Sequence, residues 1–147
     1  MSENSDPFLK HYRGYFKNLL KWEELDALWQ RLRIDHDKEW YVYAVGETPP
    51  QQPVDSEQLA RFIEEIDTLL RNEHDEDYCG IVYVDEVDQP GFIKIYDPNN
   101  LGSSCGSGSA PPPLPGWILS QLPPSDLNVA FPPPANRRRW WQRVFGN

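Results

Sequence analysis

The sequence predicts an α+β fold, in which helices pack on one face of a small, mostly antiparallel sheet of three or four strands. Apolar residues recur at helical spacing near the N-terminus and again over residues 59–70, and short runs of aromatic and β-branched residues follow these stretches. The 147 residues show no internal repeat. We therefore expect one domain over residues 1–135, followed by a basic and aromatic tail at 136–147.

The N-terminal helix is predicted from its first residues and its apolar spacing. Asp6 followed by Pro7 gives an N-cap and a first-turn proline, and apolar side chains then recur over residues 8–20. A second apolar set at 22–32 continues with a shifted phase. The pattern predicts either one bent helix or two helices that meet near Lys21.

The clearest helix is predicted to begin after Asp55. Gln58 stands three residues later, in the capping-box position. Apolar residues then form a single stripe over residues 59–70, and the polar residues 71–77 are expected to end the helix.

Strands are predicted for four short runs, at residues 40–45, 81–84, 92–96 and 117–122. The first run, WYVYAV, has no polar face, so we expect a strand that is covered on both sides. The second and third runs should form an antiparallel hairpin, with Pro90 and Gly91 at the centre of a type II turn. The last run is expected at an edge of the sheet, because prolines flank it.

Two long segments surround this last strand. The loop 97–116 is rich in glycine, serine and proline, and such a long connection tends to be functional or disordered. The proline-rich segment 123–135 is expected to be extended and to wrap the surface of the domain. The tail that follows is compatible with a short helix capped by Asn136.

Charge is distributed unevenly along the chain. The net charge is −9, but the last eleven residues contain four arginines and no acid, so residues 1–136 carry −13. An acidic body repels phosphate backbones, anionic membranes and acidic substrates. The sequence has neither an 18-residue apolar run nor a secretory signal at its N-terminus. We expect an acidic cytoplasmic protein that does not insert into membranes, with Cys79 and Cys105 reduced.

Cys105 is the candidate catalytic residue. In the sequence GSSCGSG its thiolate could act as a nucleophile, with His74 or His36 as the base and loop amides as an oxyanion site. A loop of this composition does not hold a nucleophile in place unless other residues pack against it. Cys79, just before a predicted strand, is more typical of a small buried apolar side chain.

No metal and no cofactor are expected from the motifs. Cysteine and histidine residues do not occur in the close pairs that anchor zinc. The glycine-rich stretch lacks the lysine and serine of a phosphate-binding loop and leads into prolines, not into a helix.

The C-terminal third contains the residue types most typical of a binding surface. The candidate binding residues are Trp117, Arg137, Arg138, Arg139, Trp140, Trp141 and Arg143. Alternating arginine and tryptophan can bind single-stranded nucleic acid. The charge of the body instead favours docking of the tail on the domain's own acidic surface or on a partner protein.

The leading functional hypothesis is a non-catalytic accessory or regulatory factor that binds another protein. It rests on the aromatic, proline and arginine residues outside the predicted core. The first alternative is an enzyme that uses Cys105. The second is single-stranded nucleic-acid binding by the arginine and tryptophan tail.

Overall fold

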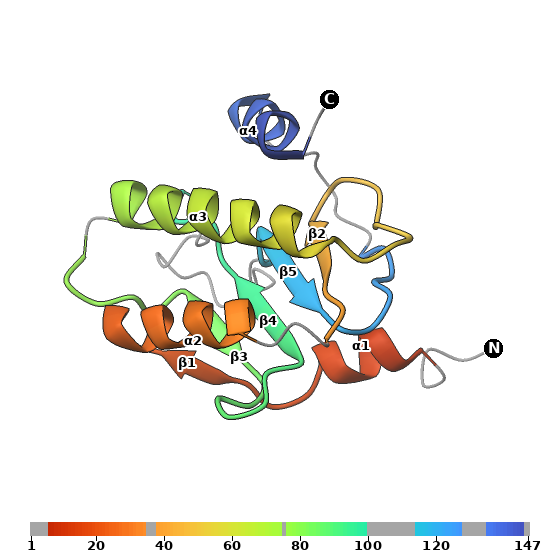
Figure 1. Ribbon diagram of the computed structural model, residues 1–147, viewed down its shortest axis with the longest axis horizontal. Coiled ribbons are helices and arrows are strands. Elements are labelled where there is room, and N and C mark those ends of the chain that lie inside the picture. The colour runs from red at the N-terminus through yellow and green to blue at the C-terminus, as the bar shows by residue number, and fades with distance from the viewer. Residues whose placement is uncertain (1–5, 35–37, 75, 100–113, 128–134, 146–147) are drawn as a thin grey trace, which may run out of the picture.

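A computed structural model describes residues 6–34, 38–74, 76–99, 114–127 and 135–145 (Figure 1). The helices are α1 (Pro7–Tyr12), α2 (Trp22–Ile34), α3 (Ser56–Glu73) and α4 (Ala135–Phe145). The strands are β1 (Lys17–Leu19), β2 (Tyr41–Ala44), β3 (Val82–Val84), β4 (Phe92–Ile95) and β5 (Trp117–Ser120). They form one sheet in the order β1-β3-β4-β5-β2, and all neighbouring strands are antiparallel. The predicted α+β class is confirmed, with five strands in this part of the chain instead of three or four.

Helices cover both faces of the sheet, not one face as expected. Helices α2 and α3 lie side by side over one face and close the larger core (Figure 1). On the opposite face, Phe8 of α1 packs with Tyr43 of β2 and Ile118 of β5. Alternate residues of a strand point to opposite faces, and both faces of β2 are apolar, so the sheet needs a cover on each side. The prediction that residues 40–45 are covered on both sides is confirmed.

The N-terminal region was predicted as helix up to residue 20, and this prediction is wrong beyond Tyr12. Lys17–Leu19 form β1, and Leu19 pairs with Val82. The N–H of Gly14 bonds to the carbonyl of His11 just after α1. Leu19 joins the larger core under α2 and Phe16 packs against the smaller core on the opposite face, so pairing in the sheet overrides the helical period.

Both predicted helix starts are confirmed. The carboxylate of Asp6 accepts the N–H groups of Phe8 and Leu9 at 2.9 and 3.2 Å. Asp55 and Gln58 form the complete capping box of α3, since each side chain bonds the backbone N–H of the other residue. These caps satisfy N–H groups that the first turn of a helix leaves free.

The β3–β4 hairpin is confirmed, but its predicted type II turn is wrong. Such a turn needs a positive φ at Gly91, and among the described glycines positive φ occurs at Gly46 and Gly80. The turn is closed by the carboxylate of Asp85, which accepts the N–H groups of Gly91 and Phe92 at 3.0 and 3.2 Å. Hydrogen bonds to the Asp85 side chain therefore hold this turn, and the expected type II backbone conformation is not formed.

Strand β5 lies inside the sheet, between β4 and β2, and not at an edge as expected. All four of its residues are buried. The backbone of Gly116 extends the pairing, because its N–H bonds to Ile95 and its carbonyl to Val45. The flanking prolines stand outside these paired residues, so they remove no hydrogen bond from the ladder.

The segment after β5 crosses the face that α1 covers. Leu122 and Leu127 pack against the smaller core, and the N–H of Leu127 bonds to the Tyr43 hydroxyl at 3.3 Å. This contact agrees with the predicted surface wrapping for residues 123–127. Residues 128–134 and the loop residues 100–113 lie outside the described part of the chain. Within the described residues, no helix is both long and apolar enough to cross a membrane.

Candidate binding site

Of the three candidate catalytic residues, Cys105 and His36 lie outside the described residues. His74 follows α3 and is 8% exposed. Its ring packs edge-to-face against Trp22 and Tyr78, with ring centroids 6.1 and 6.0 Å away. In the described part of the chain its Nε2 has no hydrogen-bond partner. The structure therefore places His74 in an aromatic environment and leaves its pairing with Cys105 untested.

Cys79 is fully buried, as expected for a small apolar side chain. Burial raises the pKa of its thiol, which keeps the sulfur protonated and makes it a poor nucleophile. Among the residues that the structure describes, no cluster of three histidine, cysteine or acidic side chains is arranged to bind a metal.

Lys94 is a half-buried amine that the sequence did not single out. Its Nζ lies 4.1 Å from the ring centroids of both Tyr12 and Phe16, on the face that α1 covers. Burial lowers the pKa of Lys94 to about 8. The two rings stabilise the ammonium through their π faces, so this lysine joins α1 and the following residues to the sheet.

Helix α4 is attached to the domain through Arg137, which is 8% exposed. Its guanidinium donates to both oxygens of Asp97, from Nε at 2.7 Å and from Nη2 at 2.9 Å. It also donates from Nη2 to Glu73 at 2.6 Å. Hydrogen bonding to Asp97 raises the pKa of Arg137, and hydrogen bonding to Arg137 lowers the pKa of Glu73. This buried network joins α4 to the end of α3 and to the residues after β4.

The aromatic side of α4 covers apolar surface of the domain. The rings of Trp140 and Trp141 each lie 6.3 Å from the ring of Phe62 on α3. Trp140 also packs edge-to-face on Trp117 at 5.4 Å, and Trp117 is 3% exposed. The tryptophans therefore contribute to packing within the chain.

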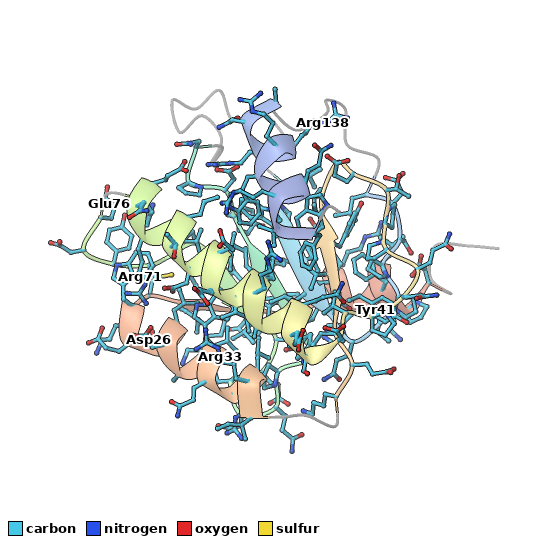
Figure 2. The ribbon with its side chains drawn as sticks, turned by 45° about the horizontal axis from the view of Figure 1, so that its top comes forward. Asp26, Arg33, Tyr41, Arg71, Glu76 and Arg138 are labelled. Atoms are coloured by element: carbon cyan, nitrogen blue, oxygen red, sulfur yellow. The ribbon has the colours of Figure 1, made fainter. Side chains whose placement is uncertain are left out.

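The exposed arginines of α4 also contact the protein's own acids. Arg138 lies 3.5 Å from Glu47, and Arg143 lies 2.9 Å from Glu65. Figure 2 shows Arg138 on α4, which lies against α3. Arg139 is exposed. The tail lies on the domain itself, which is one of the two alternatives that the sequence left open, and its helix begins at Ala135, one residue before the expected cap at Asn136.

A hollow of about 550 Å³ opens on another side of α3. Three segments build it, namely the end of α2, residues 38–40 before β2, and residues 54–60 at the start of α3. Its floor is apolar and consists of Leu32, Trp40, Val54 and Leu59. Three of these side chains are also buried members of the main core, so the floor is fixed by packing.

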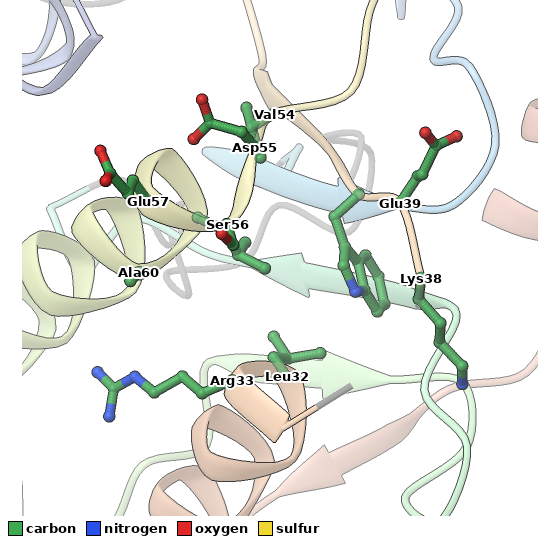
Figure 3. A pocket seen from close by; sticks show the side chains of 11 residues that line it. Leu32, Arg33, Lys38, Glu39, Val54, Asp55, Ser56, Glu57 and Ala60 are labelled. Atoms are coloured by element: carbon green, nitrogen blue, oxygen red, sulfur yellow. The ribbon is translucent and has the colours of Figure 1, made fainter. Parts of the chain in front are cut away.

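Charged side chains of opposite sign stand on the rim of this hollow. Arg33 extends from the end of α2 and Lys38 from the segment before β2, whereas Asp55 and Glu57 stand at the start of α3 (Figure 3). Glu39 adds a third carboxylate near Lys38. The rim can therefore orient a ligand that presents a positive group to α3 and a negative group to α2.

Trp40 gives the floor a polar feature. It is 1% exposed, and its Nε1 has no acceptor among the described residues. A buried N–H without an acceptor is rare and destabilising, by about 1 to 3 kcal/mol. The same N–H provides a specific spectroscopic signal at the floor of the hollow.

Sequence reasoning missed the hollow because its walls come from three separate segments. Trp40 was predicted as the start of a strand, which begins one residue later at Tyr41, and Asp55 was correctly predicted as a helix cap. One signal was available in the sequence. The strand predicted to begin at Trp40 and the helix capped by Asp55 are connected by a short loop with three prolines, which brings the start of the strand and the start of the helix close together.

Comparisons of the chain with protein-family models, curated proteins and solved structures find no match. By its fold, the described part of the chain is an α+β domain with an antiparallel sheet covered on both faces. By its geometry, the candidate site is an open apolar hollow with a charged rim.

Proposed function

We propose that the chain is a non-catalytic binding protein, an accessory or regulatory factor whose hollow accepts an apolar side chain of another protein. The main support is the open hollow of about 550 Å³ with its apolar floor. Ligand pockets commonly have volumes of about 300 to 1,000 Å³. An apolar side chain that enters such a site gains about 1.5 to 3 kcal/mol from burial.

The floor and the rim have separate roles in this proposal. Leu32, Trp40 and Leu59 belong to the core, so the partner does not need to order them on binding. The charges of Arg33 and Glu57 stand on opposite sides of the opening, and they set the direction in which a peptide lies across it.

The contacts of the tail also favour a binding protein over nucleic-acid recognition. Arg137, Arg138 and Arg143 each contact a carboxylate of the domain. Phosphate groups would have to compete with these carboxylates in a protein whose net charge is −9. The tail therefore acts in this proposal as part of the domain and not as a nucleic-acid arm.

The proposal is tested by filling the hollow. Ala60 lines it from an exposed position on α3, so Ala60→Trp blocks the opening without disturbing the core. Ala27→Trp on the exposed side of α2 is the matched control, because it adds the same side chain away from the hollow. The immobilised chain is used to select binders from a random-peptide display library.

We expect selected peptides to lose affinity by about tenfold or more with Ala60→Trp and by less than about twofold with Ala27→Trp. Bound peptide should also shift the ¹⁵N–¹H signal of the Trp40 indole, which is identified as the signal that is missing in Trp40→Phe. A library that yields no binders, or binders that are indifferent to Ala60→Trp, would contradict the proposed function.

A further inference from the structure

The two edges of the sheet differ in their surroundings. At the β2 edge, the N–H of Val54 bonds to the carbonyl of Trp40 at 2.9 Å, so the chain itself adds a pairing segment there. At the other edge, β1 (Lys17–Leu19) pairs with β3 on one side, and Figure 1 shows no further strand of the described residues beside it. Edge strands present unpaired backbone groups that other chains can pair with.

The hydrogen bonds of the neighbouring strands show which residue of β1 points outward. The N–H of Asp85 bonds to Phe92 and that of Tyr96 bonds to Ile81, so residues 81, 83 and 85 direct their backbone groups to β4. Val82 and Val84 consequently direct theirs to β1, where they oppose residues 19 and 17. The intervening residue, Asn18, therefore directs its N–H and C=O away from the sheet.

Exposed apolar side chains gather at both ends of this strand. Among the described residues, five large hydrophobic side chains are exposed, and four of them lie around β1: Tyr15 (88%), Leu20 (56%), Tyr78 (52%) and Val87 (47%). The carbonyl of Leu20 accepts the N–H of Cys79 at 2.9 Å, which places Tyr78 at one end. The β1–β3 register brings Tyr15 toward the turn that contains Val87 at the other end.

Acids outnumber bases among the exposed charges that accompany these apolar pairs. Exposed acids adjoin both pairs, namely Glu76 and Asp77 before Tyr78, and Glu86 and Asp88 around Val87, while the bases Arg13, Lys17 and Lys21 stand before and along β1. Figure 2 shows Glu76 at the outer margin of the molecule, beyond α2 and α3. Both ends of the edge therefore favour a segment with terminal positive charges.

We infer that the β1 edge, defined as Lys17–Leu19 with Tyr15, Leu20, Tyr78 and Val87, binds an extended segment of a basic partner protein as a sixth strand. The distance from Tyr15 to Leu20 along an extended chain is about 17 Å, which suits a segment of about six residues. Backbone bonds to Asn18 provide affinity, and the apolar pairs and acidic turns select apolar residues between basic ones. This surface contains no residue of the hollow.

The test uses the full ¹⁵N-labelled chain and two blocked peptides, KITVTIK and its acidic twin EITVTIE. We expect KITVTIK to shift the amide signals of Asn18 and Leu20, and to bind about tenfold more tightly than EITVTIE at low salt. Asn18→Pro removes the outward N–H, whereas Asn18→Ala keeps it and loses the same side chain. Binding should disappear in the first variant and persist in the second.

Equal binding by the two Asn18 variants, equal binding of the two peptides, or dimerisation of the free chain through this edge would each overturn the inference. If Asn18→Pro does not fold, the double variant Leu20→Ser, Tyr78→Ser decides, with an expected loss of about fivefold in affinity. Ala60→Trp should leave KITVTIK binding unchanged, so failure at this edge and failure at the hollow are distinguishable.

Discussion

The outer strand at each edge of a sheet presents unpaired backbone groups, and the two edges of this sheet differ in how these groups are protected. At the β2 edge the chain pairs with itself at one point, through the bridge between Trp40 and Val54 just before β2, and the segment that forms this bridge leads directly into α3. The β1 edge has three residues, and Lys17 stands at its start. Short length and a charged residue are the usual ways to limit uncontrolled pairing of an open edge. We therefore interpret β1 as an edge strand that resists aggregation but can still pair with one short strand of a partner.

The largest expected effect on stability lies at neither edge but at α4, which docks through Arg137 on the end of α3 and on the residues after β4. Arg137→Met leaves Asp97 and Glu73 without their cation, and breaking a buried ion pair costs about 3 to 5 kcal/mol. We expect a loss of about 3 kcal/mol in the free energy of unfolding in urea, with reduced hydrogen-exchange protection of α4. Arg139→Met, at an exposed position on the same helix, should change stability by less than about 0.5 kcal/mol. Equal effects of the two variants would show that the network does not hold the helix.

Proline substitution compares the two edges directly. Val54→Pro removes the N–H that bonds to Trp40, and the loss should amount to about 2 kcal/mol relative to Val54→Ala. Asn18→Pro should cost less than about 0.5 kcal/mol relative to Asn18→Ala, because the N–H that it removes faces solvent. Urea unfolding of the four variants measures both differences. Similar differences at the two positions would contradict the assignment of Asn18 as outward-facing.

Acid should loosen the docking of α4 before it affects the β1 edge. Hydrogen bonding to Arg137 lowers the pKa of Glu73 in the folded chain below its ordinary value of 4.5, so the unfolded chain binds more protons in this range. The stabilisation is therefore complete above about pH 4.5 and is lost as the pH falls through the folded pKa. Since Glu73 is 34% exposed, we expect about 1 kcal/mol, seen as loss of α4 protection in hydrogen exchange as the pH falls below about 4.5. Glu73→Gln should abolish this pH dependence.

The sequence was sufficient where local chemistry determines the structure. Asp6 and Asp55 bond N–H groups within three residues of themselves, so both helix starts could be predicted. Charge alone indicated that the arginine tail would meet acidic groups, but it left open whether these belong to the domain or to a partner protein. The choice of Asp97 and Glu73 as its partners could not, since they lie 40 and 64 residues from Arg137 in the chain.

The rest depends on contacts between distant segments. Residues 17–19 lie within a stretch, 8–20, whose apolar spacing suits a helix, and they become a strand because β3 offers a pairing partner. The type II turn at Pro90 and Gly91 was overruled by a carboxylate five residues upstream of the proline, at Asp85. The hollow and the β1 edge are likewise formed by segments that lie far apart in the sequence, so no local sequence pattern predicts them.

The smallest effects on stability are expected at the β1 edge, where substitutions should have their largest effect on binding of the partner strand. Tyr15 is 88% exposed, so replacing it with serine removes little buried area. We expect a change in the free energy of unfolding below about 0.5 kcal/mol for Tyr15→Ser. Tyr43→Ser is the matched control, because Tyr43 is fully buried and the same change should cost about 3 kcal/mol or more. Marked destabilisation by Tyr15→Ser would mean that this tyrosine holds the domain together, and it would lose its interpretation as a contact for a partner strand.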